Sequence, residues 1–344
     1  MQTHPLYIFR LAAPADIDAI ARLTAQADTG LTTVPKTPEG VADYIDQSLR
    51  FLSGDISANR VLFVAEGPDK NILGISGIIP KLGLERPFYS FKRSRHARRS
   101  TLDNPTGKPL SVKYDTLQLT TDFDGYTELA SIFLSPEARG KGVARLLSWG
   151  RLAFIEMHRE MFETRLMADI RGWVDGAGVS PFWEHLTSKF IQTDFDVADR
   201  LSAADGRFIM ELLPSLPIML NLLPDSVNDC AGKPHDLSAG AMNLLLQAGF
   251  ETTDLCDIFD GGPAIECKTE NTLIARSRFE PETFDCEDDV VKSLHYGDRV
   301  EAFRAAIGFA DPKIKAASKS VSEVLGSNIS VSLAYERRTN ISGR

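Results

Sequence analysis

The sequence has few cysteines, the residues that form disulfides and bind structural zinc. It contains four cysteines in 344 residues, Cys230, Cys256, Cys267 and Cys286, and no two of them form a Cys-x-x-Cys pair. A structural zinc site normally needs such pairs, so we expect no metal site. The cysteines fit reduced thiols of a cytoplasmic protein, and a catalytic thiol is the alternative interpretation.

Long apolar runs are also missing. No stretch of about 18 apolar residues occurs, so we expect no membrane-spanning helix and no membrane partner. The nearest candidate, residues 212–224, contains three prolines and fits a buried irregular connection better. The apolar stretch at residues 6–13 is too short for a signal peptide and is interrupted by Arg10, so we expect no targeting segment.

Positive charge is in deficit overall. The chain has 38 lysines and arginines against 47 aspartates and glutamates, for a net charge of −9. This balance excludes an overall basic surface of the kind that binds nucleic acid, so we expect no nucleic-acid partner. One basic stretch, residues 92–100 (KRSRHARRS), lies within residues 86–116, which we expect to be irregular.

The remaining composition is that of a globular protein, with 43% hydrophobic and 25% charged residues. Its length predicts one large or two modest domains with a sizeable core. Apolar periodicity predicts alternating helices and strands. We expect helices at 14–27, 41–52, 145–162 and 180–190, strands at 6–12, 61–67, 72–80, 129–134, 165–174 and 189–195, and a helix, glycine stop and strand pair between 238 and 267.

Residues 135–147 (SPEARGKGVARLL) are the most informative stretch. They place two glycines and two cations between a buried strand and a long helix. The first amides of a helix lack internal partners and lie at the positive end of its dipole, so they can bind phosphate. Glycine lets the ligand approach the backbone closely. The pattern predicts a phosphate site, although short glycine motifs also occur in ordinary turns.

In its context, Arg-x-x-Gly-x-Ala after a strand resembles the coenzyme A signature of the GNAT acyltransferase superfamily. A closer resemblance, to the arginine N-succinyltransferase family, covers residues 7 to about 270 and fades beyond about 280. The matching blocks are GLTTVP at 30–35, GLERPFYSF at 83–91, ELASIFL at 128–134, RGWVDGAGVSPFW at 171–183, TDFDVAD at 193–199, FIMELLPSLPI at 208–218 and DIFDGGP at 257–263.

The resemblance implies an α/β protein of the α+β type, with a GNAT-like mixed, mostly antiparallel twisted sheet flanked by helices and a C-terminal extension. It implies an acyl-CoA-binding domain at 1–200, a region completing the active site at 201–280, and a divergent tail of unknown role at 281–344. The implied reaction is succinyl transfer from succinyl-CoA, a co-substrate rather than a tightly bound cofactor, to the α-amine of L-arginine.

The resemblance also implies which residues act. Ile132, Phe133 and Leu134 would contact the pantetheine arm, and Arg139, Gly140, Lys141, Gly142, Val143 and Ala144 would bind the pyrophosphate. His235, in a loop before a helix, corresponds to the family's proton-transfer histidine. Glu128, at the start of the signature strand, is the rival base, since N-acylation needs a neutral amine. His158 and His185 fit packing or surface roles, and His96 lies in the basic stretch, which could contact the 3′-phosphate of coenzyme A or simply be solvated.

The sequence departs from the family at two places. Phe123 stands where the family has a histidine, and Leu216 stands within the segment where the family reads Lys-His-Pro-Ile-Tyr. These departures leave open another acyl-CoA, another amine such as ornithine, or a non-catalytic partner subunit. We expect a homodimer or a heteromer with a paralogous subunit. A carboxylate that would meet the guanidinium of arginine is not fixed by the sequence, and the candidates are Asp169, Glu211, Asp257 and Asp260.

Overall fold

The protein is described by a computed structural model. The structure describes residues 6–27, 36–84, 86–102, 110–283, 292–311, 316–317, 319–326 and 329–333. Cys286 and the whole 30–35 block lie outside these residues. The strands are β1 Ile8–Leu11, β2 Val61–Glu66, β3 Ile72–Ile78, β4 Ser90–Arg99, β5 Ser111–Thr120, β6 Thr127–Glu128, β7 Phe133–Leu134, β8 Arg165–Asp169, β9 Ile218–Met219, β10 Glu251–Cys256, β11 Pro263–Lys268, β12 Lys292–Gly297, β13 Arg304–Asp311, β14 Ala316–Ala317 and β15 Ile329–Leu333.

Among the described residues, two helices follow β1, one follows β7, six lie between residues 181 and 277, and one precedes β15. They are α1 Ile17–Thr24, α2 Pro38–Leu52, α3 Val143–Met157, α4 Pro181–His185, α5 Phe195–Ala204, α6 Arg207–Leu212, α7 Asp225–Cys230, α8 Ala239–Gln247, α9 Leu273–Ser277 and α10 Lys319–Leu325. The mixed α/β fold with mostly antiparallel sheets is the predicted fold class, and it is confirmed.

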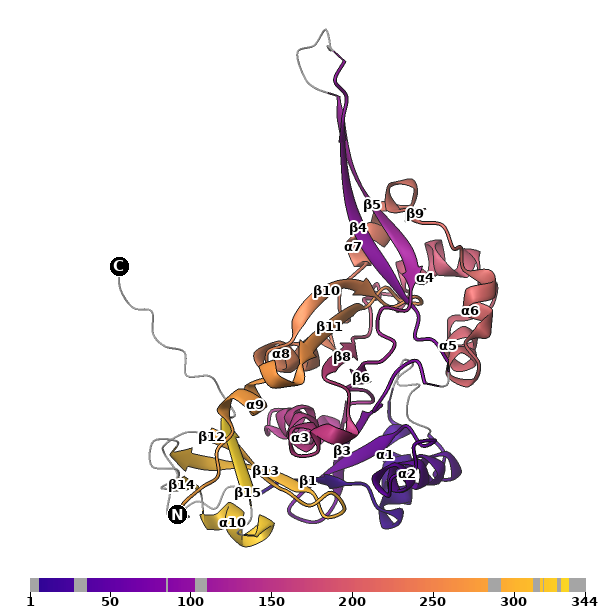
Figure 1. The fold of residues 1–344 in the computed structure, drawn as a ribbon. Helices are drawn as coiled ribbons and strands as arrows, with labels where there is room; N and C mark the ends of the chain where they lie inside the picture. The colour runs from indigo at the N-terminus through magenta and orange to yellow at the C-terminus, as the bar shows by residue number, and fades with distance from the viewer. Residues whose placement is uncertain are drawn as a thin grey trace, which may run out of the picture.

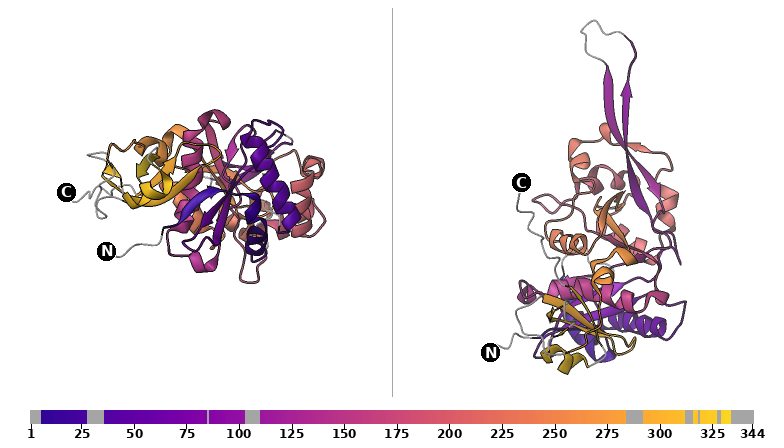
Figure 2. Two further views of the ribbon diagram at one scale, coloured as in Figure 1. Left: turned by 90° about the horizontal axis from the view of Figure 1, so that it is seen from below. Right: turned by 60° about the vertical axis from the view of Figure 1, so that its left-hand side comes forward.

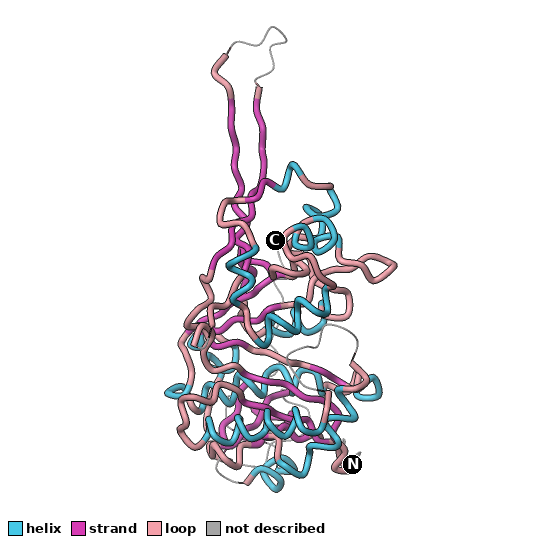
Figure 3. The backbone as a smooth tube through the Cα atoms, turned by 90° about the vertical axis from the view of Figure 1, so that its right-hand side faces the viewer, coloured by secondary structure: helices cyan, strands magenta, loops and turns pink. Residues whose placement is uncertain are grey.

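The strands form two sheets. One has the order β15-β12-β13-β1-β2-β3-β7, with β14 paired to β13, and the other has the order β6-β8-β11-β10-β4-β5-β9. All named pairs are antiparallel except β6 with β8. Figure 3 shows the two layers of strands one above the other along the long axis. The two sheets meet where the chain passes from β6 to β7, which is the segment that precedes the glycine loop.

The first sheet is buried on both faces, as its strands require. In β2, Phe63 packs with Phe9 and Phe154 on the α3 side, whereas Leu62 and Val64 pack with Ile20 and other residues of α1 and α2. Successive side chains of a strand point to opposite faces, so the continuous apolar run of β2 serves two layers of helices. The strands of the C-terminal tail complete this sheet, because β13 pairs with β1 (Figure 2, left).

Two elements differ from the sequence prediction. Residues 86–116, predicted to be irregular, contain a β4–β5 hairpin with ten paired positions from Ser90–Thr120 to Arg99–Ser111. The hairpin extends away from the body of the molecule (Figure 1). Residues 189–195 were predicted to form a strand, but the chain makes a 3-10 turn at Thr187–Lys189 and enters α5 at Phe195. There, Ile191 and Phe195 face a core cluster from a turn and a helix rather than from a strand.

Candidate active site

The glycine loop lies where the sequence predicted it, between β7 and α3. Gly140 and Gly142 have φ values of 76° and 84°, a left-handed conformation that glycine adopts without strain. An added Cβ at either position would meet no atom within 4 Å, so the space over the loop is open. The first bond of α3 runs from Leu146 N to Gly142 O (3.1 Å). The amides of Val143 and Ala144 precede this bond and have no acceptor within the helix, so they can donate to a ligand.

Charge and exposure favour the same use of this loop. Arg139 and Lys141 are exposed on either side of Gly140, while Val143 is buried at the start of α3. Most of α3 is buried against the first sheet, and its N-terminus opens to solvent. An anion at this end would meet the helix dipole, the free amides and two cations together.

The strand before the loop divides between the two sheets. Glu128 is in parallel register with Met167 of β8, and Leu129 N donates to Met167 O (2.9 Å). Four residues later, Phe133 pairs with Ile75 of β3 instead. Ile132 and Leu134 pack their side chains against the main core cluster, and Phe133 packs on the α1–α2 side. The strand pairs with β8 at β6 and has left it by β7. The edge of β7 that faces away from β3 is therefore available for an extended ligand.

Glu128 is buried beneath this division, with 7% of its surface exposed. Burial raises the pKa of Glu128 to about 7, and the nearby guanidinium groups of Arg60, Arg151 and Arg86 oppose that rise. A carboxylate with a pKa close to neutral can accept a proton from an ammonium group and release it again. The position and the pKa of Glu128 therefore suit a general base.

His235 begins the turn that leads into α8. Its backbone N donates to Arg171 O (2.8 Å), and its Nδ1 accepts from Leu237 N (3.1 Å). In the neutral ring this contact places the proton on Nε2. The ring is half-buried. The adjoining residues are tied to the same segment, since Pro234 pairs with Gly172.

The two predicted catalytic residues therefore both lie next to β8 or to the residues that continue it. Glu128 is beside Met167, and His235 is bonded to Arg171, four residues farther on. At about 3.3 Å per residue, these positions are roughly 13 Å apart along the chain. Asp169 lies between them.

Three carboxyl groups surround this continuation of β8, of which Asp260 is buried and Asp169 and Asp257 are half-buried. Asp260 accepts from the amides of Gly172 (2.7 Å) and Gly262 (2.8 Å), and Asp257 accepts from Phe259 N (2.7 Å) and Asp260 N (2.8 Å). Burial raises the pKa of all three. The neighbouring carboxyl groups add to the rise for Asp169 and Asp257, whereas hydrogen bonds from Gly172 and Gly262 oppose it for Asp260. Asp169 Oδ1 is shielded from solvent and has no hydrogen-bond partner among the described residues.

These three carboxylates are among the four that the sequence leaves open as partners of the guanidinium of arginine. Glu211, the fourth, is exposed on α6. Phe123, which stands where the family has a histidine, is 1% exposed and packs edge-on against Tyr126 at 5.2 Å. It is a core residue here. Leu216, the other departure, is 75% exposed.

The other histidines lie in packing positions. His96, on the hairpin, stacks on Tyr114 with ring centroids 4.9 Å apart and contacts Thr116 Oγ1 at 3.0 Å. His158 is 4% exposed at the end of α3, beside Phe154. His185, in α4, lies near Glu184. Cys230, Cys256 and Cys267 are buried free thiols, and burial raises their pKa values.

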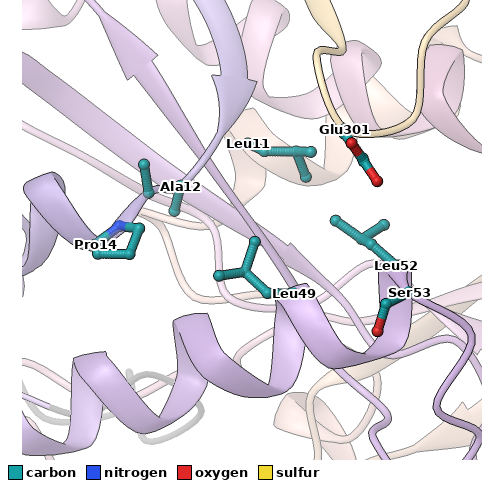
Figure 4. A pocket seen from close by; sticks show the side chains of 8 residues that line it. Leu11, Ala12, Pro14, Leu49, Leu52, Ser53 and Glu301 are labelled. Carbon is teal, nitrogen blue, oxygen red and sulfur yellow. The ribbon is translucent and has the colours of Figure 1, made fainter.

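A small groove of about 280 Å³ lies elsewhere, between β1 and the end of α2. Its lining is mostly apolar, with Leu11, Leu49 and Leu52 around it and Glu301 at one side (Figure 4). It has no group of converging polar side chains among its lining residues, so it is not a candidate for the reaction. Within the described ranges, no cluster of three or more His, Cys, Asp or Glu side chains could hold a metal ion, and no helix is long and apolar enough to cross a membrane.

Comparisons with known proteins agree with this geometry. Residues 7–274 match the family model described as arginine N-succinyltransferase beta subunit. The arginine N-succinyltransferases of Salmonella paratyphi B and Salmonella typhimurium are each 33% identical to the chain over 315 residues, which are 89% of this chain and 90% of each relative.

The solved structure of arginine/ornithine succinyltransferase subunit AI from Pseudomonas aeruginosa has a TM-score of 0.81 to this structure at 27% identity. It covers 96% of this chain and 100% of its own. The family match runs from β1 into the start of α9, before β12, and includes the glycine loop, Glu128 and His235. The chain therefore belongs to the arginine N-succinyltransferase family, and it is an acyltransferase.

Proposed function

We propose that the chain transfers a succinyl group from succinyl-CoA to the α-amine of L-arginine and releases free coenzyme A. The observation that supports this most is the juxtaposition at the end of β6. An open glycine loop at a helix N-terminus follows a strand that leaves its neighbour, and a buried carboxyl group with a pKa of about 7 lies at the point of division.

The proposed donor site uses three parts of this segment. The amides at residues 140–144, with Arg139 and Lys141, would bind the pyrophosphate. The backbone of residues 132–134 would pair with the pantetheine arm. The thioester would then lie toward residues 128–131, at the division between the sheets. Coenzyme A enters as a co-substrate in each turnover and not as a resident cofactor.

The proposed reaction starts when a base takes a proton from the α-ammonium group of arginine. The amine nitrogen then attacks the thioester carbonyl carbon, so a C–N bond forms as the C–S bond breaks. The thiolate of coenzyme A leaves, and the second proton that the nitrogen loses as the amide forms goes to that thiolate. His235 is the proposed proton-transfer residue, and Glu128 is the second candidate, with burial holding its pKa close to the working pH.

In this proposal residues 1–200 bind the acyl-CoA, and residues 201–280 complete the active site by bringing His235 to Arg171. The protein would work in the cytoplasm. The role of residues 281–344 includes completion of the first sheet, since β12, β13 and β15 belong to it.

The proposal is tested by a thiol-release assay that crosses succinyl-CoA and acetyl-CoA with arginine and ornithine. We expect the highest kcat/KM for succinyl-CoA with arginine, because a succinyl carboxylate needs a cationic or amide donor that an acetyl group does not. Equal kcat/KM for the two donors would remove the basis for succinyl transfer. A preference for ornithine would leave the reaction class intact and change the acceptor.

We also propose that the chain assembles with a second copy of itself through the β4–β5 hairpin. A two-stranded ribbon is marginal in water by itself, and its open edges favour a partner. This hairpin carries six lysines and arginines and one aspartate, while the whole chain has a net charge of −9. The exposed cations Arg98, Arg99 and Lys113 could therefore meet the acidic surface of another copy.

Sedimentation of the purified chain tests this assembly. The double variant Arg98→Glu with Arg99→Glu should dissociate the assembly, whereas Arg22→Glu with Lys189→Glu, two exposed cations on other elements, should not. A monomeric wild-type chain would contradict the proposal. If the monomer gained turnover only when a paralogous chain was added, a heteromer would replace it.

A further inference from the structure

The strand between β6 and β7 contains a bulge. Glu128 exchanges both backbone hydrogen bonds with Ile79, and Ala130 exchanges both with Gly77. The next pair in register is Phe133 with Ile75. Two steps along β3, from Gly77 to Ile75, therefore face three steps on the other strand. One extra residue is accommodated at Ser131–Ile132, and Ser131 has a φ of 57°, a left-handed conformation that is uncommon for serine.

Arg151 holds the residue at the start of this bulge. It lies in the middle of α3 and is 1% exposed. Its Nη1 donates to Ala130 O (2.9 Å) and to Gly77 O (3.3 Å), so one guanidinium bridges the two carbonyls of the last regular pair. Its Nε is shielded from solvent and has no partner within the part of the chain that the structure describes. A buried cation is costly unless its charge and its donors are used, which suggests a specific role.

The charge of Arg151 also acts on Glu128. Burial lowers the pKa of Arg151 to about 9, and Glu128 and Tyr44 oppose that change, so the guanidinium stays charged at neutral pH. Glu128 is faced by cations from three elements, Arg60 before β2, Arg86 before β4 and Arg151 on α3. It is also faced by Tyr44 of α2 and by Asp169 of β8.

We propose that Arg151 is a positioning residue for acyl transfer, because its guanidinium ties the Ala130 end of the bulge to β3 and so fixes where the strand leaves β8. The inference rests on the proposed function, in which the thioester lies at this division. The second effect of the same side chain is electrostatic. A fixed positive charge beside Glu128 favours its carboxylate form, the form that can accept a proton.

Arg151→Met tests both effects, because methionine fills similar space without charge or donors. We expect kcat to fall about 10- to 100-fold, since the reacting groups lose their alignment. The limb of the kcat–pH profile that belongs to Glu128 should move to higher pH by about one unit, since Glu128 loses an opposite charge. The dissociation constant of coenzyme A, measured by calorimetry, should change little, because the glycine loop is untouched.

Two further variants separate these effects. Arg151→Lys keeps the charge but not the planar fork, so it should restore the pH limb while kcat stays below that of the wild type. In a Glu128→Gln background, Arg151→Met should lower kcat without shifting any limb of the kcat–pH profile. Arg145→Met is the matched control, because Arg145 lies on the same helix over the ring of Trp149 (4.7 Å) and away from the bulge, and it should change neither quantity.

The inference fails if folded Arg151→Met keeps the kcat and the pH profile of the wild type. If Arg151→Met does not fold, Arg151→Lys decides, and a wild-type kcat for that variant overturns the inference. The wild-type chain in the same assay distinguishes this failure from a failure of the proposed function. Absence of wild-type turnover with every donor and acceptor would refute acyl transfer itself, whereas an active wild type with indifferent Arg151 variants would refute only the role of Arg151.

Discussion

The glycine loop and the buried carboxyl groups lie on either side of one strand division, and they are built in opposite ways. The loop at residues 139–142 is exposed, has open space above both glycines and uses backbone amides and surface cations. In the region of Glu128, Asp169, Asp257 and Asp260 the side chains are buried or half-buried, and every carboxyl group has a raised pKa. The first region is suited to binding a solvated anion, and the second to holding and moving protons.

The difference extends to the tolerance of the backbone. A Cβ added at Gly142 would meet nothing within 4 Å, but one added at Gly262 would lie 2.0 Å from Ile170 O. Substitutions in the loop should therefore affect ligand binding first, and substitutions in the carboxyl region should affect the fold first. The predictions below test this contrast, from the largest expected effect to the smallest.

The largest effect should come from His235→Ala. Turnover should fall by about 100-fold or more, the scale of acid–base catalysis, while the affinity for succinyl-CoA stays nearly unchanged because the imidazole does not contact the pyrophosphate. The limb of the pH–rate profile that belongs to an imidazole should flatten. Steady-state kinetics and calorimetry measure the two quantities.

Glu128→Gln is the comparison for this prediction, and it should cost less than His235→Ala. If the glutamine variant were nearly inactive and the alanine variant turned over normally, Glu128 would be the base. The assignment of His235 would then be wrong, and Glu128 would be the proton-transfer residue.

Gly262→Ala should destabilise the fold by about 3 kcal/mol, because the new methyl group meets backbone atoms that cannot move aside. Urea unfolding of the purified chain measures the loss. Gly176→Ala is the matched control, since a Cβ there meets no atom within 4 Å, and it should change the free energy of unfolding very little. Equal losses for the two variants would contradict the tight packing of the carboxyl region.

Gly142→Val should weaken binding of coenzyme A about tenfold or more, as the side chain enters the space above the loop and strains a left-handed backbone. Gly54→Val is the control, because Gly54 has a similar φ of 94° and equally open space at the end of α2. The two variants should lose similar stability, and only the first should lose affinity. Unchanged affinity in folded Gly142→Val would place the phosphate site elsewhere.

The last two predictions concern pH and stability, and the smallest effect is the one expected for Asp205→Asn. Burial and the nearby Asp260 raise the pKa of Asp257, so the folded chain keeps a proton that the unfolded chain loses near pH 4. Stability from this group is therefore greatest at low pH and falls as pH rises from about 4 through the raised pKa, by about 1.4 kcal/mol for each unit by which the pKa is raised. Asp257→Asn, which can still accept from the amides of Phe259 and Asp260, should flatten this dependence.

Asp205 should make stability depend on pH in the opposite direction, and Asp205→Asn tests this when melting temperature is measured against pH. Its hydrogen bonds with Arg207 lower the pKa of Asp205 to about 2, so any stability it adds is present above pH 4 and is lost on acidification toward pH 2. Asp205 is exposed, and the effect should be small because solvent screens the pair.

For Asp257, a steeper fall in stability toward high pH in Asp257→Asn than in the wild type would contradict the assignment of a bound proton.

The sequence by itself determined the features that depend on neighbouring residues. The two glycines between a strand and a helix located the loop, because a left-handed turn and a free helix end are local properties. The helix at α8, the stop at Gly249 with a φ of 103°, and the strand pair β10–β11 followed from periodicity and one glycine. Ordered blocks of similar residues identified the family, and comparison confirmed it.

Only the tertiary structure decided the rest. The hairpin was hidden because its outer residues, such as Arg95 and Arg98, are polar on both faces, so no alternation marks a strand. Burial raises the pKa of Glu128, and Arg60, Arg86 and Arg151, which come from three distant segments, oppose the rise. An arginine on a helix is usually a surface residue, and nothing local shows that Arg151 reaches the carbonyls of Ala130 and Gly77. Desolvation and charge pairing act through space, so they arise only when residues far apart in the chain are packed together.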